Sequence, residues 1–262
     1  MFEQLIQAVK QAGKHIKQGH FKSEQKDGFA NIVTQADIWS QNFLCEQISK
    51  YYENAGFICE EEHLLKENKN GLTFVIDPID GTQNFSRGIG EYAISVGVLD
   101  KGEVIFGVVY NPAKDELYVA EKGKGAYLNG KKISVSKRKL NDALFCTALS
   151  LYKKDYADVC AKIILDIYKR SNDVRRFGSC ALELCYLAKG DCDLFFEMRV
   201  FPWDYCASFL ILKEAGGEIC GYGGQKCSFN KPTMVLASNS KESLQELINT
   251  VNKYLDKVPY EE

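Results

Sequence analysis

The segment LTFVIDPIDGTQNF, at residues 72–85, constrains this chain more than any other part of it. An apolar run with the composition of a buried strand stops at Asp77, and a proline, a second carboxylate at Asp80 and the pair Gly81-Thr82 follow. Carboxylates at a strand end suit a hard divalent cation such as Mg²⁺, and the free N–H groups of a glycine turn can hold a phosphate. The same residue types also build ordinary turns, so the segment alone leaves a metal site and a simple turn both open.

Length and charge limit the kind of protein. The chain has 262 residues, 45% hydrophobic and 26% charged, which suits one large globular domain or two small ones with a sizeable core. Because 33 basic and 35 acidic side chains leave a net charge of −2, the composition indicates neither a nucleic-acid partner nor a membrane-bound protein. No segment approaches the ~20 apolar residues that span a bilayer, and the N-terminus lacks a hydrophobic signal core. We therefore expect a soluble, cytoplasmic protein.

The histidines and cysteines offer little to nucleophilic catalysis or to soft metals. The three histidines are His15, His20 and His63, and we expect the first two on the solvent side of a first helix. The ten cysteines include no Cys-x-x-Cys pair, which argues against a zinc or thioredoxin-like site, and disulfides are not expected. Cysteines in apolar surroundings should behave as small buried hydrophobic residues, namely Cys45, Cys160, Cys185 and Cys206.

Helical and strand patterns follow one another along the chain without repeats or low-complexity linkers. We expect helices at 2–18, 36–52, 154–170, 179–189, 204–215 and 240–256. We expect strands at 56–60, 72–77, 91–99, 103–110, 174–177 and 193–197, with further short strands up to about residue 148. A meander followed by alternating strands and helices predicts mixed α and β layers. We place a soft boundary between an N-terminal half, 1–145, and a C-terminal half, 146–262, with the site between them.

Several segments resemble the inositol monophosphatase family. DPIDGTxNF, which begins at Asp77, is similar to the family's metal-binding signature. Four further blocks resemble family segments in the family's order and are spread over most of the chain: 31–37, 57–61, 106–136 and 197–217. The resemblance implies an α+β fold, a layered α-β-α-β-α sandwich of the inositol monophosphatase and fructose-1,6-bisphosphatase type.

The resemblance also implies a set of metal ligands. Asp77 would bridge two Mg²⁺ ions, with Glu60 and the carbonyl of Ile79 completing the shell of the first. Asp80 and Asp204 would hold the second ion. A third, weaker Mg²⁺ would lie near Glu60, and Mn²⁺ could substitute. From the residues alone, the acidic run that contains Glu60 could be a solvated loop, and Asp204 could simply open a helix.

The implied activity is hydrolysis of a phosphomonoester, either inositol monophosphate or a related polyol or sugar phosphate, by in-line attack of a metal-activated water. Thr82 would orient that water, Asp37 would accept its proton, and Glu60 would belong to the same catalytic group. The implied substrate contacts are Asp80, Gly81, Thr82, Ser179, Glu197 and Asp204, and Lys26 matches a basic residue near the metals. From the residues alone, Asp37 and Ser179 could be helix caps and Glu197 a strand-end acid.

Other activities stay open as alternatives. They are fructose-1,6-bisphosphatase, 3'(2'),5'-bisphosphate nucleotidase, and a catalytically silent homologue with a regulatory role. Arg199, expected in a short loop over the pocket, could hold a second phosphate with its planar fork, or be an ordinary exposed arginine. Cys59, Gln83 and Cys180 depart from the residues usual in the family, which concerns substrate fit and not the ligands.

The expected partner is a small phosphorylated polyol or sugar, with no nucleic acid and no membrane. The family is typically dimeric and lithium-sensitive, so the resemblance implies a homodimer inhibited by lithium. The apolar strands at 91–110 and 143–149 are the candidates for its interface.

Overall fold

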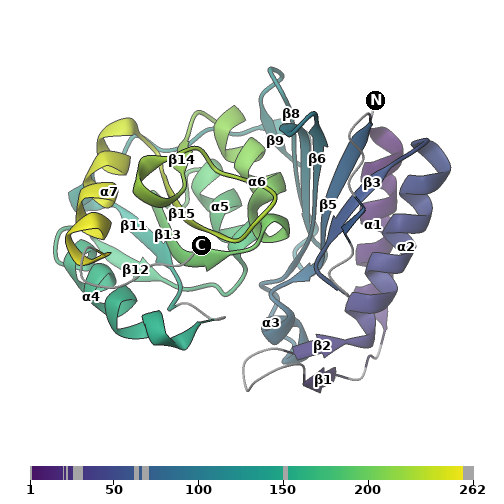
Figure 1. The fold of residues 1–262 in the computed structure, drawn as a ribbon, viewed down its shortest axis with the longest axis horizontal. Coiled ribbons are helices and arrows are strands. Elements are labelled where there is room, and N and C mark those ends of the chain that lie inside the picture. Colours follow the sequence, from purple (N-terminus) through teal and green to yellow (C-terminus); the bar gives the residue numbers. More distant parts are fainter. Residues whose placement is uncertain are drawn as a thin grey trace.

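Two large β-sheets alternate with three layers of helices in this protein, whose structure is a computed structural model (Figure 1). The structure describes residues 2–19, 21, 23–25, 32–61, 65–66, 71–149 and 153–255. The helices are α1 (Glu3–Gln18), α2 (Gln35–Tyr51), α3 (Thr82–Ser86), α4 (Ala157–Tyr168), α5 (Cys180–Ala188), α6 (Pro202–Glu214) and α7 (Lys241–Leu255). No helix in the described ranges is long and apolar enough to cross a bilayer.

The larger sheet has eight strands in the order β10-β9-β8-β7-β6-β5-β3-β4. They are β3 (Gly56–Cys59), β4 (Leu65–Lys66), β5 (Leu72–Asp80), β6 (Ala93–Asp100), β7 (Glu103–Asn111), β8 (Glu116–Glu121), β9 (Ala126–Leu128) and β10 (Lys131–Lys132). Neighbours are antiparallel except β3 and β5, which run parallel and therefore end at the same edge of the sheet. A separate two-stranded sheet pairs β1 (Ser23–Gln25) with β2 (Ile32–Thr34).

The second sheet has five strands in the order β12-β11-β13-β15-β14. They are β11 (Leu144–Thr147), β12 (Asp173–Arg175), β13 (Leu194–Val200), β14 (Glu218–Cys220) and β15 (Thr233–Ser238). β11 runs parallel to β12 and β13, and β15 is antiparallel to β13 and β14. The boundary that we place after residue 145 falls inside β11, so a division that respects both sheets lies a few residues earlier, between Lys132 and Leu144.

Three clusters of buried side chains fill the spaces between the layers. Helices α1 and α2 cover the outer face of the larger sheet, α5 and α6 lie between the sheets, and α4 and α7 cover the far face of the smaller sheet (Figure 1). Along β5, Phe74 and Ile76 pack beneath α1 and α2, whereas Val75 packs into the central layer. Burial on both faces explains why β5 reads as an unbroken apolar run.

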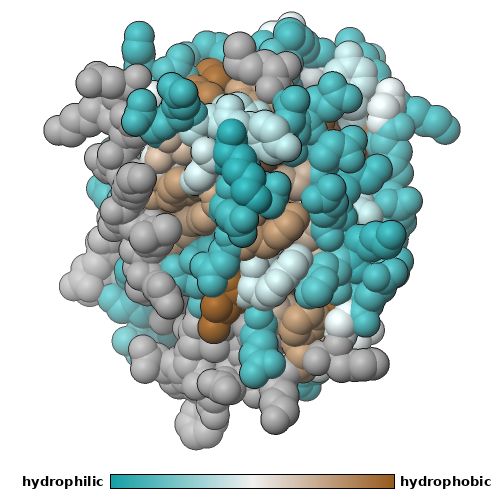
Figure 2. Space-filling view, turned by 90° about the vertical axis from the view of Figure 1, so that its right-hand side faces the viewer, coloured by the Kyte–Doolittle hydropathy of each residue, from teal (hydrophilic) through white to brown (hydrophobic). Residues whose placement is uncertain are grey.

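The outer face made by α1 and α2 is mostly hydrophilic, with apolar atoms visible between the polar side chains (Figure 2). Helix α1 turns Leu5, Val9 and Ile16 into the core beneath it, because they recur at helical spacing. Its apolar stripe is therefore used inside the fold. His15 is exposed, as expected, and stacks on Trp39 of α2 with ring centroids 3.7 Å apart.

Five strands of the described residues are absent from the expected set, namely β1, β2, β4, β14 and β15. In β15 every residue is buried, and its sequence shows no alternation of polar and apolar residues. The segments 91–110 and 143–149, expected as interface candidates, are instead largely interior. Val108 and Phe145 are fully buried in the core clusters, so these strands cannot supply the main surface of a dimer.

The cysteines mostly fill core positions. Cys160, Cys185 and Cys206 are buried, as expected, while Cys45 is partly exposed. The Cys45 sulfur lies 3.9 Å from the sulfur of Cys59, across the contact between α2 and β3.

Candidate active site

The parallel pair β3 and β5 creates the central feature of the site. The backbone N–H of Glu60, just after β3, donates to the carbonyl of Ile76 at 3.2 Å, so Glu60 lies beside the end of β5. β5 does not stop at Asp77 as its sequence suggests, but continues to Asp80. Its register with β6 shifts between Asp77 and Asp80, which is the irregularity that the intervening proline demands.

Asp77 is the buried centre of a group of four carboxylates. Its Oδ1 accepts from the backbone N–H of Ile79 at 3.0 Å. Burial raises the pKa of Asp77 well above its usual value, and the charges of Glu60, Asp80 and Asp204 and a hydrogen bond with Glu60 raise that pKa further. These acids come from the residue just after β3, from β5 and from the start of α6, and each lies close enough to repel a charge on Asp77.

Asp80 joins β5 to the start of α5. Its Oδ2 accepts from the Ser179 hydroxyl at 2.5 Å and from the N–H of Ala181 at 2.7 Å. Burial raises the pKa of Asp80 to about 6, although these hydrogen bonds act in the opposite direction. Ser179 is also the N-cap of α5, because its hydroxyl oxygen accepts from Leu182 N–H at 3.3 Å.

Asp204 holds the first turn of α6, which begins two residues earlier than expected. Its Oδ2 accepts from the N–H of Phe201 at 2.7 Å, so Asp204 does stabilise the start of this helix, as one of the two interpretations of its sequence position predicts. Burial is the main cause that raises the pKa of Asp204, followed by the charges of Glu60 and Asp80. One carboxylate therefore both stabilises a helix start and faces the acidic group.

Thr82 and Asp37 meet at the edge of this group. The Thr82 hydroxyl lies 3.2 Å from Asp37 Oδ1 and 2.9 Å from the carbonyl oxygen of Ile79, and its single proton can go to either. Asp37 is fully buried in the first turn of α2. Gly81, just before Thr82, has φ +90°, and a Cβ there would lie 2.8 Å from the carbonyl oxygen of Glu91, so only glycine fits.

Two buried glutamates lie on the side of the second sheet. Glu197, on β13, is 7% exposed and has no hydrogen-bond partner among the described residues. Burial raises the pKa of Glu197 to about 8, and the charges of Glu183 and Asp80 add to this shift. Glu183, which sequence reasoning missed, accepts from the N–H groups of Phe177 and Gly178 at 2.6 and 2.9 Å. Burial raises its pKa to about 8 as well. The signal that could have found Glu183 is that it is the one acid in an otherwise apolar helix, since a helix that is apolar on all sides is buried.

Arg199 is not in a short loop, as expected, but in β13, where it is partly exposed. The expectation was wrong because the strand extends to Val200, and a bulge follows Glu197. Arg176, which we did not single out, is the cation that lowers the pKa of Glu183 and of Glu197. The sequence feature that could have pointed to Arg176 is a pair of arginines directly before the segment Phe-Gly-Ser, which begins at residue 177. Lys26 lies outside the described residues.

The donor set fits a hard divalent cation. The acids on and around Asp77 offer only oxygen, and the carbonyl of Ile79 has a second lone pair beside the one facing Thr82. Among the described residues, no group of three or more His, Cys, Asp or Glu side chains is arranged so that these side chains by themselves could hold a metal ion. A sparse set of oxygens suits Mg²⁺, which keeps several waters and takes the rest of its shell from substrate phosphate.

Comparisons with known proteins identify the family of this chain. The inositol monophosphatase family matches residues 1–256. A fructose-1,6-bisphosphatase/inositol-1-monophosphatase of Thermotoga maritima is 33% identical over 90% of this chain and 88% of its own length. A Nus factor SuhB of Pasteurella multocida is 32% identical over 95% of both chains.

Solved structures share the fold. An inositol monophosphatase of Thermotoga maritima superimposes with a TM-score of 0.86 at 31% identity, covering 97% of both chains. The staphylococcal SaIMPase-II, solved with inositol monophosphate, gives a TM-score of 0.81 at 27% identity over 97% of this chain and 93% of its own. The same protein solved with 2'AMP gives 0.80 at 28% identity over 95% and 92%.

The layered α+β fold and the acids gathered around Asp77 are those of a metal-dependent phosphatase fold. Within that class, the chain belongs to the inositol monophosphatase family. The family resemblance and the layered α-β-α-β-α sandwich expected from the sequence are thereby confirmed. Members of the family depend on a metal, generally Mg²⁺.

Proposed function

We propose that this chain is a Mg²⁺-dependent phosphomonoester hydrolase that acts on inositol monophosphate or a related polyol or sugar phosphate. The observation that carries the proposal is the convergence of Glu60, Asp80 and Asp204 on Asp77, beside the hydroxyl of Thr82. Hard oxygen donors next to a positioned hydroxyl are what metal-assisted hydrolysis needs. The names of its relatives support the substrate class, as do the ligands of SaIMPase-II, inositol monophosphate and 2'AMP.

We propose two main cation positions and a third, weaker one near Glu60. The first ion would be held by Asp77, Glu60 and the carbonyl of Ile79. The second ion would be held by Asp77, Asp80 and Asp204. When bound, Mg²⁺ supplies Lewis acidity at the phosphoryl oxygens and lowers the pKa of a coordinated water. The same oxygen donors would accept Mn²⁺ in its place.

Thr82 and Asp37 would position the attacking water and take its proton. When the Thr82 proton turns to Asp37 Oδ1, at 3.2 Å, the lone pairs of the hydroxyl are free to accept a hydrogen from that water. Orientation of this kind brings the water in line with the phosphorus. Asp37, buried and in direct contact with the hydroxyl, is the proton acceptor that the arrangement offers.

The substrate would lie between the two sheets. The N–H groups of Gly81 and Thr82 would contact its phosphate, with Asp80, Ser179 and Asp204 beside it. Glu197 would contact its hydroxyl groups, since its buried carboxyl has no protein partner among the described residues. Because burial raises the pKa of Glu197 to about 8, the carboxyl is protonated at neutral pH and can both donate to and accept from a polyol.

Two other functions have some support. A fructose-1,6-bisphosphatase activity, named in the Thermotoga maritima relative, is favoured by Arg176, whose charge acts on Glu197. A regulatory role without catalysis is the other alternative, because several relatives are named Nus factor SuhB, but the complete set of carboxylates and Thr82 favours an enzyme.

The test is phosphate release from inositol 1-phosphate, fructose 1,6-bisphosphate and 2'-AMP, with Mg²⁺ and with excess chelator. We expect the highest kcat/KM on inositol 1-phosphate, weaker activity with Mn²⁺, and inhibition by Ca²⁺ and Li⁺. Full turnover in the presence of chelator contradicts the metal requirement. No turnover of any substrate with Mg²⁺ favours the regulatory role.

We also propose a homodimer that works in the cytoplasm. The family tendency supports the dimer, while the strands first considered for its interface are interior. Light scattering at micromolar concentration tests the assembly, and a monomer mass contradicts it.

A further inference from the structure

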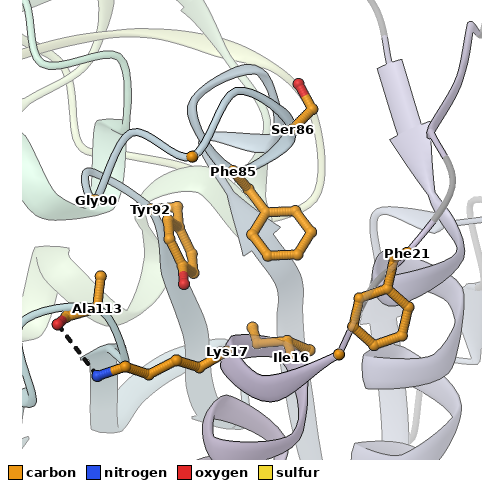
Figure 3. Close-up of a pocket in the computed structure, with 10 residues that line it drawn as sticks. Ile16, Lys17, Phe21, Phe85, Ser86, Gly90, Tyr92 and Ala113 are labelled. Carbon is orange, nitrogen blue, oxygen red and sulfur yellow. Dashed lines mark hydrogen bonds between the residues drawn. The ribbon is translucent and has the colours of Figure 1, made fainter.

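A cavity of about 360 Å³ lies beside α3 (Figure 3). It is bounded by the end of α1, by Phe21, by Phe85 of α3 and by the segment that leads into β6. No residue assigned above to metal, water or substrate lines it. Its volume lies within the range of small-molecule sites, roughly 300–1,000 Å³.

Tyr92 provides a polar group inside this cavity. The residue is only 6% exposed, and its hydroxyl has no hydrogen-bond partner among the described residues. In Figure 3 the hydroxyl end of the ring points into the cavity, toward Lys17. Burial raises the pKa of Tyr92, so the hydroxyl keeps its proton and can donate it. Because the hydroxyl faces the cavity, it can donate this proton to an acceptor atom of a ligand there.

Lys17 provides a positive charge at the same cavity. Its ammonium group contacts the carbonyl of Ala113 at 3.3 Å, and no carboxylate of the described residues pairs with it. An ammonium has three donors, so two are free for a ligand. Lys17 and Tyr92 thus present a charged donor and a neutral donor to one space (Figure 3).

The rest of the lining is aromatic and aliphatic. Phe85 meets Tyr92 edge to face, with ring centroids 5.0 Å apart, and Phe21 is tilted toward Phe85 at 6.4 Å. Ile16, 1% exposed, closes the inner side. Rings arranged in this way offer faces and edges to a further flat ring.

We propose that this cavity is a second binding site, separate from the proposed catalytic site, for a small aromatic carboxylate. The ring of the ligand lies against Phe21 and Phe85, and its carboxylate accepts from the Lys17 ammonium and the Tyr92 hydroxyl. A carboxylate matches these two donors with its two oxygens and its single charge. A phosphate dianion would leave one negative charge unbalanced against an apolar wall.

The experiment is calorimetric titration of the full chain with 2-naphthoate, and with 2-naphthamide as the uncharged counterpart. We expect one naphthoate per chain and about tenfold weaker binding of the amide, as loss of one charge-assisted contact implies. Tyr92→Phe, which removes only the hydroxyl, should weaken naphthoate binding about threefold to tenfold. Lys17→Met should weaken it about tenfold and abolish the preference for naphthoate over the amide.

Lys14→Met is the matched control, because Lys14 is an exposed lysine of the same helix that does not line the cavity. It should bind naphthoate as the unmodified chain does. Three results each overturn the proposal: no saturable binding of naphthoate, unchanged binding by both Tyr92→Phe and Lys17→Met, or displacement of naphthoate by inorganic phosphate with Mg²⁺. The last result would place the probe in the proposed catalytic site. Binding that persists in phosphate supports a separate site, whatever the enzyme assays give.

Discussion

The hydroxyl of Thr82 lies 3.2 Å from a carboxylate oxygen of Asp37, although the two residues are 45 positions apart in the chain. The contact joins the first residue of α3 to the first turn of α2. The hydroxyl contacts this fully buried carboxylate and also the carbonyl oxygen of Ile79, whose own N–H donates to Asp77. The pair should therefore act as one unit in catalysis.

Thr82→Ala should lower kcat about a hundredfold with little change in KM, because the water loses its orienting partner. Asp37→Asn should have a similar effect, and the double variant should be little worse than either single one, since both remove the same function. Steady-state kinetics on inositol 1-phosphate measures this. Ser86→Ala, which removes another hydroxyl of α3, is the control. A rise in KM at unchanged kcat would make Thr82 a substrate contact only.

Asp80→Asn should keep the fold and weaken Mg²⁺ binding. The amide oxygen can still accept from Ser179 and Ala181, so the link to α5 survives while a negative charge is lost. Titration calorimetry with Mg²⁺ and thermal unfolding report the two effects separately. Asp191→Asn, at an exposed acid far from the cluster, is the control and should leave Mg²⁺ affinity unchanged. Wild-type Mg²⁺ affinity in Asp80→Asn would remove Asp80 from the ligand set.

Glu183 should make stability depend on pH. Burial raises its pKa to about 8 in the fold, whereas its ordinary value is 4.5. Between these pH values the folded chain holds one more proton than the unfolded chain. The stabilisation is therefore complete below about pH 4.5 and is lost as the pH rises towards 8.

Glu183→Gln cannot lose a proton and should flatten that slope by a few kcal/mol between pH 5 and pH 8, as the size of the shift implies. Urea unfolding in chelator, at several pH values, measures the free energy of unfolding. Some slope should remain, because burial also raises the pKa of Glu197 to about 8. Glu46→Gln, at an exposed glutamate, should keep the full slope. An unchanged slope in Glu183→Gln would mean that Glu183 titrates like a solvated acid.

Arg199→Ala should reduce kcat/KM for fructose 1,6-bisphosphate about tenfold to a hundredfold, since a charge-assisted contact to a second phosphate is worth ~1.5–3 kcal/mol. Hydrolysis of inositol 1-phosphate should change much less. Arg176→Ala tests the alternative that Arg176, and not Arg199, holds the second phosphate, because Arg176 is the cation that lowers the pKa of Glu197. Arg175→Ala, at an exposed arginine paired with Asp173, is the control. Equal losses on both substrates would leave Arg199 without a role in specificity.

Local features of the site could be read from the sequence because they depend on neighbours along the chain. The apolar run before Asp77 predicts a buried strand, and it forms β5, although that strand continues further than expected. The glycine at 81 is required by its positive φ and by the close carbonyl of Glu91. The first helix also follows from spacing, since residues at helical intervals face one core. Arg199 was misplaced because strand ends and bulges depend on the partner strand.

What the sequence by itself determined is therefore the type and order of most elements, and the chemistry of the segment 72–85. Only the tertiary structure decided which distant acids meet. The parallel pairing of β3 with β5 brings Glu60 beside Asp77, and the packing of α5 against the strand end joins Ser179 to Asp80. Burial then sets the pKa values of Glu183 and Glu197. The physical reason is that periodicity reports which way a side chain faces, whereas proximity and desolvation depend on how the layers pack.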